Sequence, residues 1–113
     1  MEHRMKLYDQ PFGKIVDGKK TIEVRCYDEK RRTINVGDKI IFSHYDDSSR
    51  IICVTVTNVV CFKTFRDLYS SYPLEKFGHV DLSVDEMVAS AYSIYSKEQE
   101  QLYGVVAIHI EKI

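Results

Sequence analysis

The chain has 113 residues, 44% hydrophobic and 29% charged, with a formal net charge of -1, and these values exclude a disordered chain and a coiled coil. This length predicts one domain, residues 1–113, that folds alone. Lys and Arg outnumber Asp and Glu by ten to seven in residues 1–40, but number four against eight in residues 64–113; the charge therefore favours an anionic ligand near the N-terminal half.

The first half of the chain predicts strands and one short helix. Pro11 suits the first position of a helix, and Gly18 is placed to end it in a left-handed conformation. Asp28–Arg32 predicts a charged, mobile loop, and Gly37 supplies the turn before the next strand. The predicted elements are a strand at 4–8, a helix at 11–17, strands at 21–27, 39–43 and 51–62, and a hairpin loop at 44–50.

After residue 63 the hydrophobic period becomes that of helices. Thr64 can cap a first helix, and Ser83 with Glu86 predicts a capping box for a second helix that runs to about residue 94. A third helix follows Ser96 and precedes a final strand at 105–111. This order predicts a mixed α+β fold in which the last strand closes a small sheet or barrel.

The stretch from Gly18 to Arg25 combines a turn, paired lysines and a strand with its charges on one face. Successive side chains of a strand point to opposite faces, so Thr21, Glu23 and Arg25 share one face, opposite Ile22, Val24 and Cys26. If these charged side chains face solvent, they form an ordinary surface ion pair. If they face a cleft, they form a candidate functional site. From the residues alone both interpretations stay open.

Within this stretch, Lys20 and Arg25 can hold a phosphate or a carbonyl oxygen, while Glu23 accepts a hydrogen bond or activates water. Lys20 and Glu23 are therefore the catalytic residues if the protein is an enzyme. We expect Glu23→Gln to abolish ligand binding or turnover with little loss of stability.

Neighbouring residues extend the candidate site. Lys30, Arg31 and Arg32 can contact a nucleic-acid backbone, although a solvated loop explains them at least as well. Tyr27 and Tyr45 lie near polar loops, where a ring can stack on a base. Thr21 can orient a ligand and also fits as an ordinary strand former. The candidate ligand-binding residues are Lys19, Lys20, Thr21, Glu23, Arg25, Tyr27, Arg31 and Arg32.

Cysteine and histidine spacing predicts neither a metal site nor a cofactor. Cys26, Cys53 and Cys61 make no Cys-x-x-Cys pair, and the four histidines show no His-x-x-x-His spacing, so we expect reduced, buried thiols and no metal. No apolar run approaches the roughly 18 to 20 residues of a membrane span, and no signal-type segment follows the first residues. The sequence predicts a soluble, cytoplasmic protein without a membrane partner, and leaves the oligomeric state open.

Several segments, taken in order, carry a resemblance to a known family. They are Pro11–Phe12 at the helix start, the pattern of Gly18, Lys20, Glu23 and Arg25, the pair Gly37–Asp38, and the closing run Tyr103–Ile108. Together they resemble the ASCH domain family, the small bacterial members of the PUA-like superfamily, over nearly the whole chain. The resemblance implies an α+β fold with a small, partly open β-barrel of mixed strands, flanked by helices, and a cleft lined by the motif strand.

The resemblance also implies an association with RNA, and some relatives in the family are hydrolases, among them acetylcytidine amidohydrolases and a ribonuclease-like member. The amidohydrolase pattern looks like Gly-x-Lys-Thr-Ile-Thr-x-Arg, with the lysine and the second threonine catalytic. Lys20 matches that lysine, whereas Glu23 stands where that threonine would be.

Three functions follow as hypotheses. The first is binding of RNA or a nucleotide-like small molecule around Lys20, Glu23 and Arg25, in an open, basic, aromatic groove. The second is a small hydrolase acting on a modified nucleoside or RNA, with Glu23 as base and Lys20 stabilising an oxyanion, in a closed pocket with a desolvated carboxylate. The third is a protein-interaction module, which predicts an exposed apolar patch on the helix at 83–95.

Overall fold

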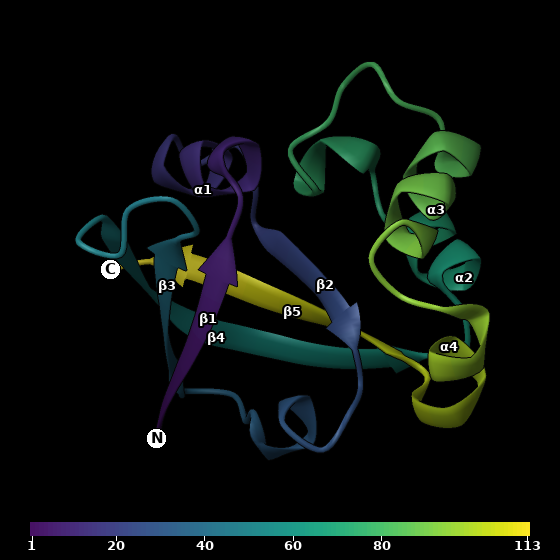
Figure 1. The fold of residues 1–113 in the computed structure, drawn as a ribbon, viewed down its shortest axis with the longest axis horizontal. Coiled ribbons are helices and arrows are strands. Elements are labelled where there is room, and N and C mark those ends of the chain that lie inside the picture. The colour runs from purple at the N-terminus through teal and green to yellow at the C-terminus, as the bar shows by residue number, and fades with distance from the viewer.

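Five strands form one curled sheet. The computed structural model describes all 113 residues, Met1–Ile113. The strands are β1 (Glu2–Leu7), β2 (Ile22–Cys26), β3 (Lys39–His44), β4 (Ile51–Phe62) and β5 (Val105–Lys112), in the order β1-β3-β4-β5-β2 (Figure 1). The β1 and β3 strands are parallel, and all other pairs are antiparallel. The sheet is a half-barrel with β1 and β2 as its open edges.

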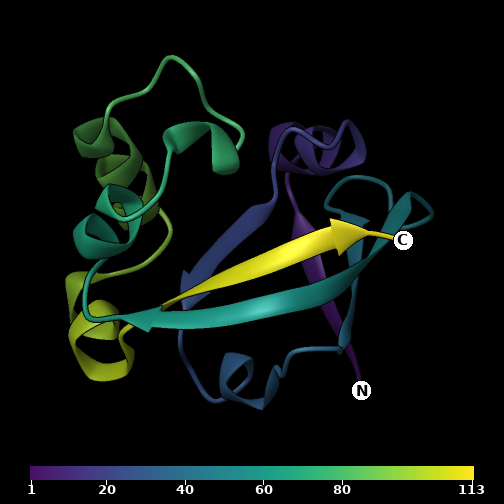
Figure 2. The same cartoon turned by 180° about the vertical axis from the view of Figure 1, so that it is seen from behind.

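Helices flank this sheet, as the α+β prediction requires. They are α1 (Asp9–Val16), α2 (Phe65–Ser70), α3 (Val84–Tyr92) and α4 (Lys97–Tyr103), with 3₁₀ turns η1 (Arg31–Thr33) and η2 (Leu74–Lys76). The Thr64 side chain caps α2, and capping boxes at Ser83 and Ser96 begin α3 and α4, which confirms the predicted helix starts. The α2, α3 and α4 helices gather on one side of the molecule, and α1 lies apart from them (Figures 1 and 2).

The two faces of β5 are buried in two different apolar clusters. Val106 and Ile108 pack with α1 and the inward side chains of β1, β3 and β4, whereas Val105 and Ala107 pack with α2 and α3. The β2 strand pairs with β5 so that Glu23 lies opposite Ile108 and Arg25 opposite Val106. Because directly opposite residues share a face, this register turns both charged side chains away from α2 and α3.

The structure corrects some predicted bounds. The helix predicted from Pro11 begins at Asp9, which places Pro11 in the first turn, where its missing amide proton costs little. The predicted mobile loop at 28–32 runs into η1, and Asp28 accepts hydrogen bonds from the amide and the guanidinium of Arg31, at 3.1 and 2.8 Å. The strand at 51–62 is confirmed, with a bulge near Asn58 that ends its strict alternation. None of the helices combines the length and apolar character that a membrane crossing requires.

Candidate functional site

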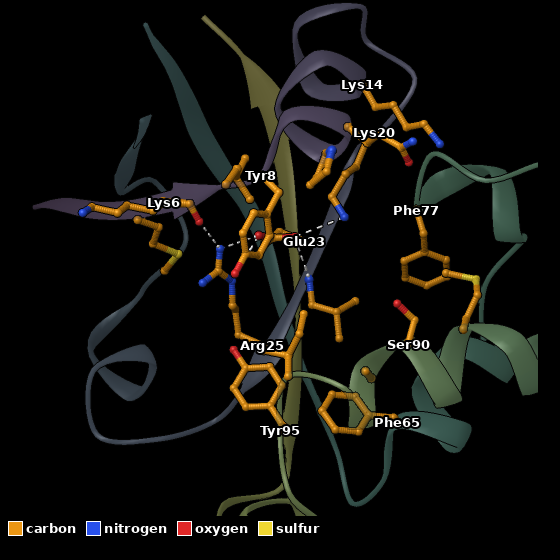
Figure 3. A pocket seen from close by; sticks show the side chains of 18 of the residues that line it. Lys6, Tyr8, Lys14, Lys20, Glu23, Arg25, Phe65, Phe77, Ser90 and Tyr95 are labelled. Atoms are coloured by element: carbon orange, nitrogen blue, oxygen red, sulfur yellow. Dashed lines mark hydrogen bonds and ion pairs between the residues drawn. The ribbon is translucent and has the colours of Figure 1, made fainter. Parts of the chain in front are cut away.

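A cleft of about 930 Å³ extends across the free edge of β2. Figure 3 shows Lys6 and Tyr8 on one side of β2, and Phe77 and Phe65 on the other. The charge of the lining is one-sided, because seven basic side chains face a single carboxylate, that of Glu23. The basic residues are Arg4, Lys6, Lys14, Lys20, Arg25, Lys30 and Arg31. The described residues contain no group of three or more His, Cys, Asp or Glu side chains that could hold a metal ion.

Glu23, Lys20 and Arg25 form a buried ion triad at the centre of the cleft. The Lys20 Nζ atom lies 3.1 Å from Glu23 Oε1, and Arg25 donates to Glu23 Oε2 from Nε at 3.1 Å and from Nη2 at 2.8 Å. The three side chains are only 11%, 6% and 15% exposed for Lys20, Glu23 and Arg25. The charged stripe of β2 therefore faces a cleft, and the solvent-facing alternative is wrong for Glu23.

Arg25 also ties together the two open edges of the half-barrel. Its Nη2 donates to the backbone carbonyl of Lys6 at 3.1 Å, which links β2 to β1 across a gap where no ladder of backbone hydrogen bonds forms. One guanidinium thus contacts the triad carboxylate and the neighbouring strand. Its planar group of five donors suits such a bridge, which a lysine cannot replace.

The electrostatic balance of the triad keeps Glu23 ionised. Burial raises the pKa of Glu23, but the charges and hydrogen bonds of Lys20 and Arg25 outweigh it and hold the pKa at about 2. Burial acts to lower the pKa of Arg25, and the Glu23 carboxylate outweighs it and raises that pKa. At neutral pH the triad therefore carries one negative and two positive charges.

Turns at either end of the cleft place two of the lysines. Gly18 ends α1 at φ +77°, and the amides of Lys19 and Lys20 then donate to the Lys14 carbonyl, at 2.9 and 3.0 Å. A Cβ on Gly78 would lie 2.9 Å from Lys14 Cδ and 3.2 Å from Lys20 Cβ, at φ +86°. The chain therefore passes over both lysines at a distance that only glycine permits.

His79 follows this glycine and contacts one of the lysines. Lys14 Nζ lies 3.2 Å from His79 Nδ1. Burial lowers the pKa of His79, and the nearby charges of Lys14 and Lys20 lower it further. The imidazole is therefore neutral at pH 7. Its Nδ1 accepts a hydrogen bond from the Lys14 ammonium, and its Nε2 carries the proton and can donate.

Four candidates from the sequence line this cleft, and four do not. Lys20, Glu23, Arg25 and Arg31 line it, whereas Lys19, Thr21, Tyr27 and Arg32 lie outside it.

The corrections have local causes. The ladder of β2 begins only at Ile22, so alternation does not extend to Thr21, which lines a separate hollow of about 240 Å³. Lys19 is exposed at the end of the α1 turn. Arg32 stacks on the Tyr27 ring at 4.7 Å and donates to the Tyr103 carbonyl, so these two side chains contact each other and not the cleft.

Sequence reasoning missed the residues that other elements bring to the cleft. Lys6 and Tyr8 come from β1 and its end, Lys14 from α1, and His79 from the segment after η2. The excess of basic residues before residue 40 was the only signal for the lysines. Tyr45, considered as a stacking residue, does line the cleft.

This architecture, a curled half-barrel sheet flanked by helices, matches that of ASCH and PUA-like structures. The model of the ASCH domain family matches residues 5–113, and the chain belongs to the ASCH domain family, as the resemblance in sequence implied. Membership supports an RNA-binding or related function and specifies no ligand. A comparison with curated proteins finds no match.

Solved structures share the fold. The crystal structure of the hypothetical protein PH0355 is 36% identical with a TM-score of 0.90, and each chain covers 100% of the other. The solution structure of protein PF0455 from Pyrococcus furiosus is 34% identical with a TM-score of 0.78, over 100% of this chain and 98% of that one. A mutant ASCH protein from Zymomonas mobilis is 17% identical with a TM-score of 0.63, over 97% of this chain and 67% of that one, which indicates a common fold alone.

Proposed function

We propose that this ASCH domain binds RNA or a nucleotide-like ligand, with a phosphate held in the cleft at Lys20 and Arg25. The observation that carries the proposal is the charge of the lining, where seven basic side chains face one carboxylate. Glu23 cannot neutralise this excess, because Lys20 and Arg25 already engage both of its oxygens. Phosphate contacts made by Lys and Arg supply most of the affinity in nucleic-acid recognition.

In this proposal Glu23 is a positioning residue. It fixes the Lys20 ammonium and the Arg25 guanidinium at 3.1 and 2.8 Å from its own oxygens, and each cation has further N–H donors for a ligand. Ordering the two cations before binding lowers the entropy cost of holding a phosphate. A carboxylate that engages the Lys20 ammonium and only two of the five guanidinium donors of Arg25 thus prepares an anion site.

The hydrolase alternative has one observation in its favour, since Lys20 is desolvated and charged, as an oxyanion-stabilising group should be. Glu23 suits the role of base poorly, because a carboxylate whose pKa lies at about 2 accepts a proton weakly at neutral pH. A hydrolytic reaction here would need another base, and neutral His79 is the group in the lining best suited to it.

The protein-interaction alternative has no comparable support. It needs an apolar patch on α3, whereas Met87, Val88 and Ala91 of that helix are buried in the second cluster. Ile94, just beyond α3, is 64% exposed and lines the same basic cleft.

The test is binding of a fluorescent single-stranded RNA, followed by anisotropy at several salt concentrations, with product analysis of the same samples. We expect salt-sensitive binding with a slope of about −0.7 per phosphate contact in a plot of log affinity against log salt. Lys20→Gln and Lys14→Gln should each weaken binding about tenfold. Lys63→Gln, an exposed lysine outside the cleft, should leave binding unchanged.

Thermal unfolding of each variant keeps the result interpretable, because Lys20→Gln removes one partner of a buried carboxylate. Lys14 belongs to no ion pair with that carboxylate, so Lys14→Gln tests the cleft even if Lys20→Gln unfolds. Absence of salt-sensitive binding to RNA and to nucleotides would overturn the proposal. Products formed by the wild type and lost in Lys20→Gln would select the hydrolase.

A further inference from the structure

Tyr8 and Tyr45 form an exposed aromatic pair at the rim of the basic cleft. Their rings stack with centroids 4.5 Å apart and planes at 9°, and both residues line the cleft. They are 60% and 51% exposed, respectively. Every other tyrosine and phenylalanine of the chain is buried or half-buried, so this pair is the most exposed aromatic surface of the chain.

We propose that the Tyr8–Tyr45 pair is a stacking platform for a base of single-stranded RNA, next to the nucleotide whose phosphate lies at Lys20 and Arg25. This rests on the function proposed above and narrows its ligand to a polynucleotide strand, which reaches both places at once. Bases of single strands stack on aromatic side chains without strong sequence preference, and basic residues follow the backbone between them.

Contacts on β1 connect the triad to the platform. Arg25 Nη2 donates to the Lys6 carbonyl at 3.1 Å, and Lys6 Nζ lies 5.6 Å from the centre of the Tyr45 ring. Arg4 and Lys6 both line the cleft from the outward face of β1. Arg4, Lys6 and the two tyrosines therefore line the same cleft as Arg25, and a strand bound at Arg25 has basic side chains and aromatic rings beside it.

The fold does not need these two rings for its core. The Tyr45 amide donates to the Leu7 carbonyl at 2.9 Å, and this backbone bond joins the ends of β3 and β1 whatever the side chains are. Phe12, four residues after Tyr8, is only 3% exposed, as a ring that serves packing should be. Tyr8 and Tyr45 instead leave more than half of their surface in solvent while their backbones are fixed.

The test compares an eight-nucleotide single-stranded RNA, the same RNA as a duplex, and a nucleoside monophosphate. Tyr8→Ala and Tyr45→Ala should each lower the affinity for the single-stranded RNA by about 5- to 100-fold. Each should leave the monophosphate affinity and the salt slope unchanged. Tyr45→Phe, which keeps the ring, should bind as the wild type does, and so should Leu102→Ala, a 73% exposed residue outside the cleft.

Stacking has a direct signature, because ring protons of Tyr8 and Tyr45 should shift upfield in NMR spectra when the single strand is added, and much less with the duplex. If both alanine variants bind the single strand normally while Lys14→Gln weakens it, the platform is overturned and the proposed function stands. An equal loss of monophosphate affinity in the alanine variants would also overturn the platform. If no nucleic acid binds at all, both proposals fail.

Discussion

Two buried carboxylates, Glu23 and Asp38, have similar acidity and very different surroundings. Hydrogen bonds from His3 at 2.8 Å and from the Asn35 amide at 2.9 Å hold the pKa of Asp38 at about 2. Two cations hold the pKa of Glu23 at the same level. A depressed pKa therefore does not by itself separate a structural carboxylate from a site carboxylate.

The difference lies in what surrounds the partners. Asp38 precedes β3, and its partners are a histidine of β1, the amide of a turn residue and the chain's terminal amine. None of these groups lines the cleft. The two partners of Glu23, in contrast, line the cleft together with five further basic side chains. The charge left over after pairing marks the Glu23 cluster as the candidate site.

The largest difference between the two carboxylates should appear in the stability of the Glu23→Gln variant. The amide leaves Lys20 and Arg25 buried without their counter-charge, so we expect a loss of about 3 to 5 kcal/mol in the free energy of unfolding. Asp38→Asn should cost less, because an amide oxygen can still accept from the Asn35 amide. Urea unfolding of the two variants measures both values, and a larger loss for Asp38→Asn would contradict this view of the triad.

The second-largest effect should be the loss of stability at low pH, to which both carboxylates contribute. Both carboxylates have pKa values below those of the unfolded chain, so their stabilisation is complete above pH 4.5 and is lost as pH falls towards 2. For Glu23 the loss amounts to about 3 kcal/mol. Urea midpoints between pH 2 and 7 should show the decline. His3→Gln removes the main cause of the lowered pKa of Asp38. In this variant the share of the acid-induced stability loss that is due to Glu23 should remain.

The local parts of the fold were predictable because their signals are local. The capping boxes at Ser83 and Ser96 lie within four residues of sequence, and the β-branched run at 51–62 needs no partner to be recognised as a strand. The 3₁₀ turn at 31–33 was not predicted. Asp28 accepts a hydrogen bond from the Arg31 amide there, but no helical spacing of apolar residues follows Asp28 to indicate a turn.

The candidate site was predictable only where it lies on one strand. Alternation along β2 predicted that Glu23 and Arg25 share one face of the strand. The strand order β1-β3-β4-β5-β2, which brings Lys6 beside Arg25, cannot be predicted from the sequence of either segment. The burial of Glu23 was equally hidden, and it changes an expectation. The sequence predicted that Glu23→Gln would hardly affect stability, whereas two buried cations make a large loss the expected result.

Glycines beside the two clusters allow a sharper, smaller test. Gly37 precedes Asp38 at φ +93° with nothing within 4 Å of an added Cβ, whereas Gly78 has Lys14 Cδ at 2.9 Å. Ala at either position should cost about 1 to 2 kcal/mol of stability from backbone strain. Only Gly78→Ala should also weaken RNA binding, roughly threefold to tenfold, because it displaces Lys14 and Lys20. Equal RNA binding by the two variants would show that the position of these lysines is unimportant.

The smallest expected effect is the pH dependence that His79 gives to RNA binding. Its pKa lies below 6.5 in the free protein, held down by burial and by Lys14 and Lys20 and opposed by Asp81. A bound phosphate would favour the imidazolium, so affinity should rise about twofold to fivefold between pH 7.5 and 5.5. Anisotropy titrations at fixed ionic strength measure this rise. His79→Gln should flatten it and His3→Gln, at the Asp38 cluster, should not; an unchanged rise in His79→Gln would place the protonating group elsewhere.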